Sequence, residues 1–421
     1  MFQKLSPLLK LEPGEARAVG WAFAYFFLLL ASYYILRPLR DEMGIAGGID
    51  KLPWVFTGTF IAMLAAVPLF GFITARLPRQ RFLPLVYGFF ILNLLLFYAA
   101  FQHEDWRAHT ARAFFIWVSV FNLFVVSVFW SFMVDLFASS QGKRLFGLIA
   151  AGGTAGAITG PTLTALLAAP LGPVNLLPIS ALLLAGTVLC IRQLGHWSAR
   201  QPAAPSRHAA EPLGGSIFAG LTLIVRSPYL LGIALFMLLF TTLATFLYFE
   251  QAHIVAQSFT APAERTRFFA LLDLAVNTLT VLTQVLVTSR LLTRLGVAGT
   301  LALMPLLSAL GFALLALTPA LAVLAGFQVL RRAGEYAVTR PARELLYTVV
   351  DRETKYKAKN ALDTVVYRGG DALAGWLFAG LKSLGIGLAM IAWIAVPLAL
   401  VWAGVAYALG RRQAALSRPG N

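Results

Sequence analysis

The residues of this sequence that could do chemistry are arginines, carboxylates and tyrosines inside long apolar runs. Five of the 34 basic residues fall within or at the ends of such runs, and they are Arg331, Arg332, Arg340, Arg343 and Arg368. An ionisable side chain in hydrocarbon costs at least about 2.5–3.5 kcal/mol on insertion scales, so each one is a functional candidate. A guanidinium group binds phosphate or carboxylate through two parallel hydrogen bonds. This chemistry points to an anionic solute.

Helical spacing places several of these residues on one face of the run 319–346. At about 100° per residue, Arg332, Tyr336 and Arg343 share a narrow arc, which Glu335 and Arg340 flank. Pro341 is expected to kink this helix beside them, because proline cannot donate the backbone hydrogen bond of a regular turn. We therefore expect a charged, bent helix that lines a cavity.

Three other runs carry polar side chains at helical spacing. The stripe of the run 360–381 is Asn360, Asp363, Thr364, Tyr367, Arg368 and Asp371. The stripe of the run 266–289 is Asp273, Asn277, Thr280 and Gln284. The outer end of the first run carries Tyr33, Arg37 and Arg40. Polar stripes in apolar helices are expected to face a protein interior or water.

These positions give a candidate site. We expect the solute to contact Tyr33, Arg37, Arg40, Arg332, Tyr336, Arg343, Tyr367 and Arg368. We expect coupling or gating roles for Asp273, Asn277, Glu335, Asp363 and Asp371. Two alternatives stay open. Pairs such as Arg331 with Glu335 or Arg340 with Glu344 could only lock helices together, and Asp273 or Glu335 could carry a coupling proton.

The elements that must position these side chains are membrane helices. The chain is 59% hydrophobic and 12% charged, and a bilayer core takes about 20 apolar helical residues to cross. Twelve runs qualify: 17–36, 53–75, 82–101, 113–137, 145–168, 172–192, 229–249, 266–289, 296–318, 319–346, 360–381 and 387–410. Gly152, Gly153 and Gly156 are expected to permit close helix packing. The fold class is therefore all-α integral membrane.

The twelve runs divide into two sets of six. The segment between them is polar and proline-rich, which predicts a six-helix bundle at 1–195, a cytoplasmic linker at 196–215 and a second six-helix bundle at 216–421. With a cytoplasmic N-terminus, the inside segments carry 21 basic residues and the outside segments eight. Basic loops resist translocation. Both termini are expected to be cytoplasmic, in a bacterial inner membrane.

Several function classes are disfavoured. The five histidines are scattered without HExxH or paired spacing, and Cys190 is the single cysteine, so no metal, cofactor or catalysis is expected. The net charge of +16 comes mainly from basic loop residues that set the orientation in the membrane. No soluble domain is left to bind nucleic acid. The expected partners are a small anionic solute and lipid, with a monomer favoured. A lipid flippase of the same fold and a non-transporting partner subunit remain as alternatives.

Three segments carry a family resemblance. The segment 71–81 resembles the cytoplasmic basic loop of the major facilitator superfamily. The segment Pro341–Asp363 and the segment Ile35–Asp41 resemble motifs of the ATP:ADP antiporter family, in which a lysine stands at the position of Arg40. The resemblance implies passage or gating roles for Arg37, Arg40, Asp41, Arg343, Glu344, Lys355, Lys357, Lys359 and Asp363. It implies a secondary transporter that moves an anionic, phosphorylated, nucleotide-like metabolite as an exchanger or proton symporter.

Overall fold

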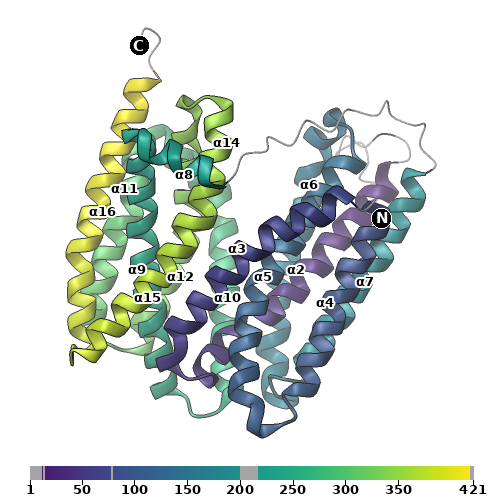
Figure 1. Cartoon of the computed structure of the whole chain (residues 1–421), viewed down its shortest axis with the longest axis horizontal. Coiled ribbons are helices and arrows are strands. Elements are labelled where there is room, and N and C mark those ends of the chain that lie inside the picture. The colour runs from purple at the N-terminus through teal and green to yellow at the C-terminus, as the bar shows by residue number, and fades with distance from the viewer. Residues whose placement is uncertain (1–11, 13–14, 77–78, 200–216, 418–421) are drawn as a thin grey trace. The chain divides into compact units, whose positions relative to one another are not determined.

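The structure is a computed structural model that describes residues 12, 15–76, 79–199 and 217–417 (Figure 1). Within these residues every regular element is helical. The expected linker lies largely outside the described residues, as do Leu77 and Pro78 of the basic loop, and the side chains of 70–81 are not described.

The first six expected runs are all helices. They are α2 (Glu15–Ala46), α3 (Leu52–Arg76), α4 (Arg79–Ala100), α5 (Arg107–Leu136), α6 (Ser139–Leu171) and α7 (Leu176–Ser198), with the short 3-10 segments η1 (Ile49–Lys51) and η2 (Glu104–Trp106) between them. Each helix extends beyond its expected run at one or both ends, by as much as ten residues at the end of α2, because polar residues continue the helix outside the apolar stretch.

The second half begins with α8 (Ile217–Arg226), which precedes the first apolar run of this half. The helices α9 (Pro228–Ser258), α10 (Pro262–Leu286), α11 (Thr288–Leu317) and α16 (Leu388–Leu416) match four expected runs. The two charged runs are interrupted. One comprises α12 (Leu321–Gly334), η3 (Glu335–Thr339) and α13 (Arg340–Leu346), followed by η4 (Tyr347–Val349). The other comprises α14 (Arg352–Ala361), η5 (Leu362–Val366) and α15 (Tyr367–Ser383).

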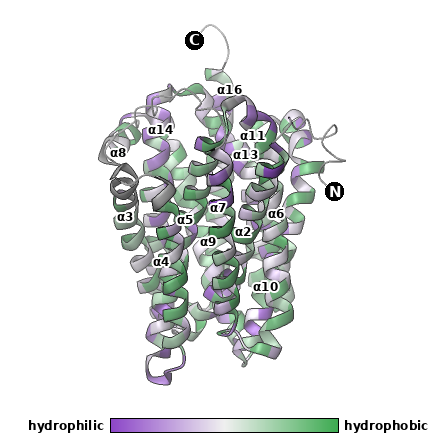
Figure 2. Ribbon diagram, turned by 90° about the vertical axis from the view of Figure 1, so that its right-hand side faces the viewer, coloured by the Kyte–Doolittle hydropathy of each residue, from purple (hydrophilic) through white to green (hydrophobic). Residues whose placement is uncertain are grey.

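Ten helices of the described residues are long and apolar enough to cross a membrane. The two charged, interrupted runs lie at the positions of the other two expected spans. Figure 2 shows hydrophobic residues along the long helices, and many large apolar side chains are exposed on them, including Leu166 (67%), Leu182 (74%) and Val285 (74%). Apolar surface of this extent requires lipid as its solvent. The chain is an all-α, multi-pass membrane protein, as its sequence predicts.

The helices form two compact units. Unit 1 comprises Met1–Gly47, Ala65–Arg207 and Ala261–Leu274, and unit 2 comprises Gly48–Leu64, His208–Thr260 and Ala275–Asn421. The predicted boundaries at 195 and 215 stay a prediction. Each unit has its own packed interior.

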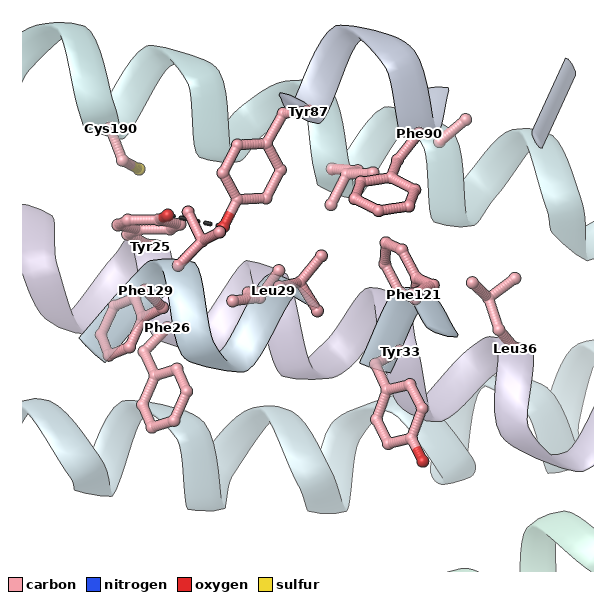
Figure 3. Packing of buried hydrophobic residues seen from close by; sticks show 14 of the residues in the cluster. Tyr25, Phe26, Leu29, Tyr33, Leu36, Tyr87, Phe90, Phe121, Phe129 and Cys190 are labelled. Carbon is pink, nitrogen blue, oxygen red and sulfur yellow. Dashed lines mark hydrogen bonds between the residues drawn. The ribbon is translucent and has the colours of Figure 1, made fainter. Parts of the chain in front are cut away.

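The interior of unit 1 is built on aromatic residues (Figure 3). The hydroxyls of Tyr25 and Tyr87 are hydrogen-bonded at 2.6 Å in a fully buried position. The Phe26 and Phe129 rings stack at 4.1 Å. Cys190 lies beside the tyrosine pair and is buried, so it contributes to packing as expected for a small apolar residue.

Helices α2 and α6 approach closely through glycines. A Cβ atom on Gly152 would lie 2.4 Å from the carbonyl oxygen of Phe23, and one on Gly156 would lie 2.3 Å from that of Phe27. Neither distance is possible for a real side chain. The close packing expected for the glycines of α6 is confirmed, because only glycine lets the two backbones meet here.

In unit 2, α9 packs against α15 and α16. Phe236 and Phe240 of α9 lie 5.5 and 5.8 Å from the Trp402 ring of α16. Phe249 of α9 and Phe378 of α15 meet edge to face at 5.2 Å. These contacts bury one side of α9 along its whole length and hold α15 beside it.

Candidate functional site

Unit 1 brings together two residues that the sequence assigned to separate roles. The Arg37 Nε atom of α2 lies 3.6 Å from the Asp273 Oδ2 atom of α10. The Asp273 side chain is 1% exposed and that of Arg37 is 12% exposed. The Arg37 guanidinium also lies 5.8 Å from the Tyr34 ring, which meets the Tyr33 ring edge to face. A buried carboxylate of this kind requires a partner, and Arg37 is that partner.

Arg40 is held by its neighbour in the sequence. Its Nε and Nη2 atoms donate to Asp41 Oδ1 at 3.1 and 2.7 Å, and its guanidinium lies 5.1 Å from the Phe115 ring. The next residue, Glu42, accepts two hydrogen bonds from Arg265 of α10 at 2.7 and 3.0 Å. The end of α2 therefore carries a row of charge-assisted contacts. The sequence analysis named Arg40 and Asp41 as candidate site residues without pairing them, and it did not name Glu42 or Arg265.

Unit 2 contains a cluster of guanidinium groups around η3, which is a π-helical turn. Arg331 is half-buried, and its Nη2 atom donates to Gln328 Oε1 at 3.4 Å. Its Nε atom is buried and donates to no acceptor in the described residues. Arg340 lies 4.5 Å over the Tyr336 ring, and its Nε atom is 4.0 Å from Glu335 Oε1. We name Arg331, Arg332, Glu335, Tyr336, Arg340, Tyr367, Arg368 and Asp371 the guanidinium cluster.

The π turn has a local cause. Pro341 has no N–H, so the Ala337 carbonyl four residues earlier loses its helical donor, and the Arg340 N–H bonds to Glu335 O instead of Tyr336 O. The Thr288 hydroxyl donates to the Ala337 carbonyl at 2.7 Å. The Tyr336 carbonyl, which has lost the Arg340 donor, accepts a hydrogen bond from Gln284 Nε2 at 3.4 Å. Side chains of neighbouring helices therefore satisfy both carbonyls.

The π turn changes which residues share a face. An extra residue in a turn rotates everything beyond it by about 100° relative to a regular helix. Arg343 accordingly lies elsewhere than expected from its spacing to Arg332. Its Nη1 atom is 2.8 Å from Met237 Sδ of α9, and its Nη2 atom is 3.7 Å from Asp363 Oδ1.

The second charged run contributes the other side of the guanidinium cluster. Arg368 of α15 lies 5.1 Å over the Tyr367 ring, and its Nη1 atom donates to Asp371 Oδ2 at 3.4 Å. Thr245 of α9 donates to Asp371 Oδ1 at 3.3 Å. Arg331 interacts electrostatically with both Tyr367 and Asp371. The two charged runs therefore meet around Arg331, a residue that the sequence analysis did not include among the expected solute contacts.

The run 360–381 is also interrupted by a π turn, η5. Of the elements that the structure describes, η3 and η5 are the two π turns, and both interrupt the charged runs of unit 2. Such turns occur frequently at functional sites. Asn277 of α10 is buried in the same unit, at 8% exposure.

A separate ionic group lies where α13, η4 and α14 meet. The Lys359 Nζ atom contacts both Glu344 oxygens at 2.6 and 2.7 Å. Asp351 caps α14 by accepting from the Thr354 N–H at 2.9 Å, and this backbone hydrogen bond lowers the pKa of the Asp351 carboxyl below its usual range. Glu344 is thus bound to Lys359, two residues that the family resemblance singled out.

The charge of the guanidinium cluster favours an anion. Four guanidinium groups face two carboxylates, so the cluster has a formal excess of two positive charges. Among the described residues, no group of three or more histidine, cysteine, aspartate or glutamate side chains could hold a metal ion. The arrangement can bind an anion through forked donors, with the Tyr336 and Tyr367 rings beside them.

Comparisons with known proteins were made at three levels. No known protein family's profile matches the chain, and no curated protein sequence matches it. Solved structures do match. A bacterial homologue of the iron transporter ferroportin, in an inward-facing state, has a TM-score of 0.67 and 14% identity over 96% of this chain and 99% of that one. The chain has the major-facilitator fold.

Two further solved structures agree with this assignment. A bacterial homologue of the human lysosomal transporter Spinster has a TM-score of 0.63 and 13% identity over 98% of this chain and 100% of that one. The nucleoside transporter NupG has a TM-score of 0.63 and 15% identity over 96% and 99% of the two chains. At these identities the likeness establishes the major-facilitator fold and leaves the solute to be inferred from the chain's own residues.

Proposed function

We propose that the chain is a secondary active transporter that moves an anionic, phosphorylated, nucleotide-like metabolite by alternating access. The observation that carries the proposal is the guanidinium cluster of unit 2, with its excess of two positive charges and the buried Arg331 Nε atom. A buried donor that lacks an acceptor is costly. An anion in the cluster supplies that acceptor and neutralises the excess charge.

The guanidinium donors of the cluster support a phosphorylated solute. Planar guanidinium groups bind phosphate bidentately and stack on aromatic rings, and the cluster places arginines over Tyr336 and Tyr367. A tyrosine ring can equally stack on a nucleobase. The motif resemblance to the ATP:ADP antiporter family supports a nucleotide-like solute, as does the structural similarity to the nucleoside transporter NupG.

The distribution of basic residues supports a proposal for the membrane and the orientation of the chain. We propose a bacterial inner membrane and cytoplasmic termini on the basis of 21 basic residues in the inside segments against eight outside. We also propose that the chain acts as a monomer. Exchange and proton symport are both compatible with the guanidinium cluster.

Ligand-induced thermal stabilisation tests the proposal. Purified protein is heated with each member of a panel of nucleotides, sugar phosphates, inorganic phosphate, carboxylates and lysophospholipids. A ligand that binds the folded state at about 100 times its Kd stabilises by about 2.7 kcal/mol, which is a measurable shift in Tm. We expect stabilisation by a phosphorylated anion, reduced in Arg331→Ala.

A matched arginine controls for unspecific charge effects. Arg294 of α11 is exposed and has no ion pair in the described part of the chain. Arg294→Ala is therefore expected to keep the full ligand shift. Stabilisation by lysophospholipids alone, or a shift that Arg331→Ala leaves intact, would overturn the proposal.

A further inference from the structure

A buried carboxyl group in unit 2 has no role in the guanidinium cluster. Glu250 of α9 is 1% exposed, and its Oε1 atom has no hydrogen-bond partner in the described residues. It lies on the helix face of Leu243, Leu247 and Ile254, each of which is at most 5% exposed. A carboxyl group therefore occupies a position on α9 at which the helix otherwise presents aliphatic side chains.

No described residue forms an ion pair or a hydrogen bond with the Glu250 side chain. The titratable groups at its level are Asp371 and Lys382 of α15, Asp50 and Lys51 of η1, and His253 of α9 itself. Arg226 of α8 and Asp363 of η5 lie toward the opposite end of α9. The parts of α12 and α16 beside the second half of α9, Leu321–Leu330 and Leu388–Ala406, contain no charged residue.

These surroundings favour the neutral form. An isolated carboxylate in an apolar interior is far more costly than the protonated acid, so such a group takes up a proton. A group of this kind releases its proton only when water or a cation reaches it. Glu250 is thus a site for one proton whose occupancy depends on the conformation around it.

A pocket lies against the part of α9 that contains Glu250. A cavity of about 380 Å³ is lined by residues that include Asp50, Phe249, His253 and Lys382. Phe249 precedes Glu250 in the sequence, and His253 follows it by three residues, about one turn of the helix. The His253 Nδ1 atom is 2.8 Å from the Phe249 carbonyl oxygen, so its ring is held against its own helix. Asp50, His253 and Lys382 therefore line a cavity within one helical turn of the buried acid.

We propose that Glu250 binds and releases the proton that couples solute movement to a proton gradient, and that the proton passes through the pocket beside His253. The step is the protonation of one carboxylate oxygen and its reversal. This inference rests on the proposed transport function and chooses proton symport over simple exchange.

A chemical test of the proton site needs no solute. Dicyclohexylcarbodiimide reacts with protonated carboxyl groups in apolar surroundings, and mass spectrometry locates the adduct. We expect labelling of Glu250 that falls as the pH is raised, and none at the exposed Glu264. Absence of a Glu250 adduct at every pH would overturn the proposal.

Transport in proteoliposomes tests the coupling. An imposed pH gradient is expected to drive accumulation of the stabilising anion by the unmodified protein. Glu250→Gln, which imitates the neutral acid, is expected to abolish gradient-driven accumulation and to retain exchange of solute across the membrane. Glu264→Gln is the control and should accumulate normally. Gradient-driven accumulation by Glu250→Gln at the unmodified rate would overturn the proposal.

The two proposals fail in different ways. If Glu250 is labelled as expected and no panel compound is transported by any variant, the proposed solute class fails and the proton site stands. If exchange occurs and no pH gradient drives accumulation, proton coupling fails and anion transport stands.

Discussion

Arg265 of α10 donates two hydrogen bonds to Glu42 of α2, from Nε at 2.7 Å and from Nη2 at 3.0 Å. The Glu42 side chain is 1% exposed and that of Arg265 is 13% exposed. The two residues are joined across 223 positions of sequence. A buried, bidentate pair of this kind ties the start of α10 to the end of α2 within unit 1.

Removing one member of this pair should be strongly destabilising. Arg265→Met leaves the Glu42 carboxylate buried without its partner, which costs about 3–5 kcal/mol. Arg265→Met combined with Glu42→Leu should recover much of that loss, since no uncompensated charge remains. Unfolding in detergent, followed by tryptophan fluorescence, measures the double-mutant cycle.

The control for this cycle is an exposed pair. Lys357 and Glu353 of α14 form an ion pair in which Glu353 is 64% exposed. Lys357→Met should cost about 0–1 kcal/mol. If Arg265→Met costs no more than Lys357→Met, the Glu42 pair does not stabilise unit 1.

The contact of α2 with α6 predicts opposite effects for two glycines of one helix. Gly156→Ala would place a Cβ atom 2.3 Å from the Phe27 carbonyl oxygen, so the helices must separate. Overpacking of this kind costs about 1–3 kcal/mol. Gly147 of the same helix has no atom within 4 Å of an added Cβ, so Gly147→Ala should stabilise α6 by up to about 1 kcal/mol. Equal Tm values for the two variants would contradict the close packing.

The hydrogen bond from the Thr288 hydroxyl to the π turn should make a measurable contribution to stability. Thr288→Val keeps the shape of the side chain and removes its hydrogen bond to the Ala337 carbonyl, which leaves a buried acceptor unpaired at a cost of about 1–3 kcal/mol. Thr293 bonds within its own helix and is exposed, so Thr293→Val is the matched control and should be nearly neutral. A Thr288→Val protein as stable as Thr293→Val would show that Ala337 finds another donor.

The cap of α14 predicts a dependence on pH. Because the folded state lowers the Asp351 pKa, the cap stabilises α14 above the usual aspartate range, and this contribution is lost as the pH falls through the folded-state pKa. Asp351→Ala should speed amide exchange at Thr354 at neutral pH, and Asp351→Asn should largely preserve protection. Identical Thr354 exchange in all three proteins would rule out the cap.

The membrane helices could be predicted from sequence because hydropathy is summed over about 20 residues and tolerates local error. Contacts between helices could not be predicted from sequence. Arg37 and Asp273 were each recognised as charges in apolar runs, but a single sequence carries no signal that joins residues so far apart. Glu250 was missed for a simpler reason. The predicted run ended at 249, which placed the carboxyl group in a loop.

The guanidinium cluster shows where helical periodicity stops being informative. Its arginines were found because charge in an apolar run is conspicuous. The shared face expected for Arg332, Tyr336 and Arg343 requires a regular helix, and the π turn at Glu335–Thr339 intervenes. Pro341 indicated a disturbance, but it did not indicate a π turn instead of a kink.

The most direct test of anion binding by the guanidinium cluster is solute counterflow in proteoliposomes. Unmodified protein, Arg331→Ala, Arg331→Lys and the control Arg294→Ala are compared for uptake of the stabilising phosphorylated anion. Loss of hydrogen bonds to a charged group is worth about 1.5–3 kcal/mol, so Arg331→Ala should lower apparent affinity about 10- to 100-fold. Arg331→Lys should be intermediate, and Arg294→Ala unchanged. Equal uptake by Arg331→Ala and Arg294→Ala would contradict a role for the cluster in solute binding.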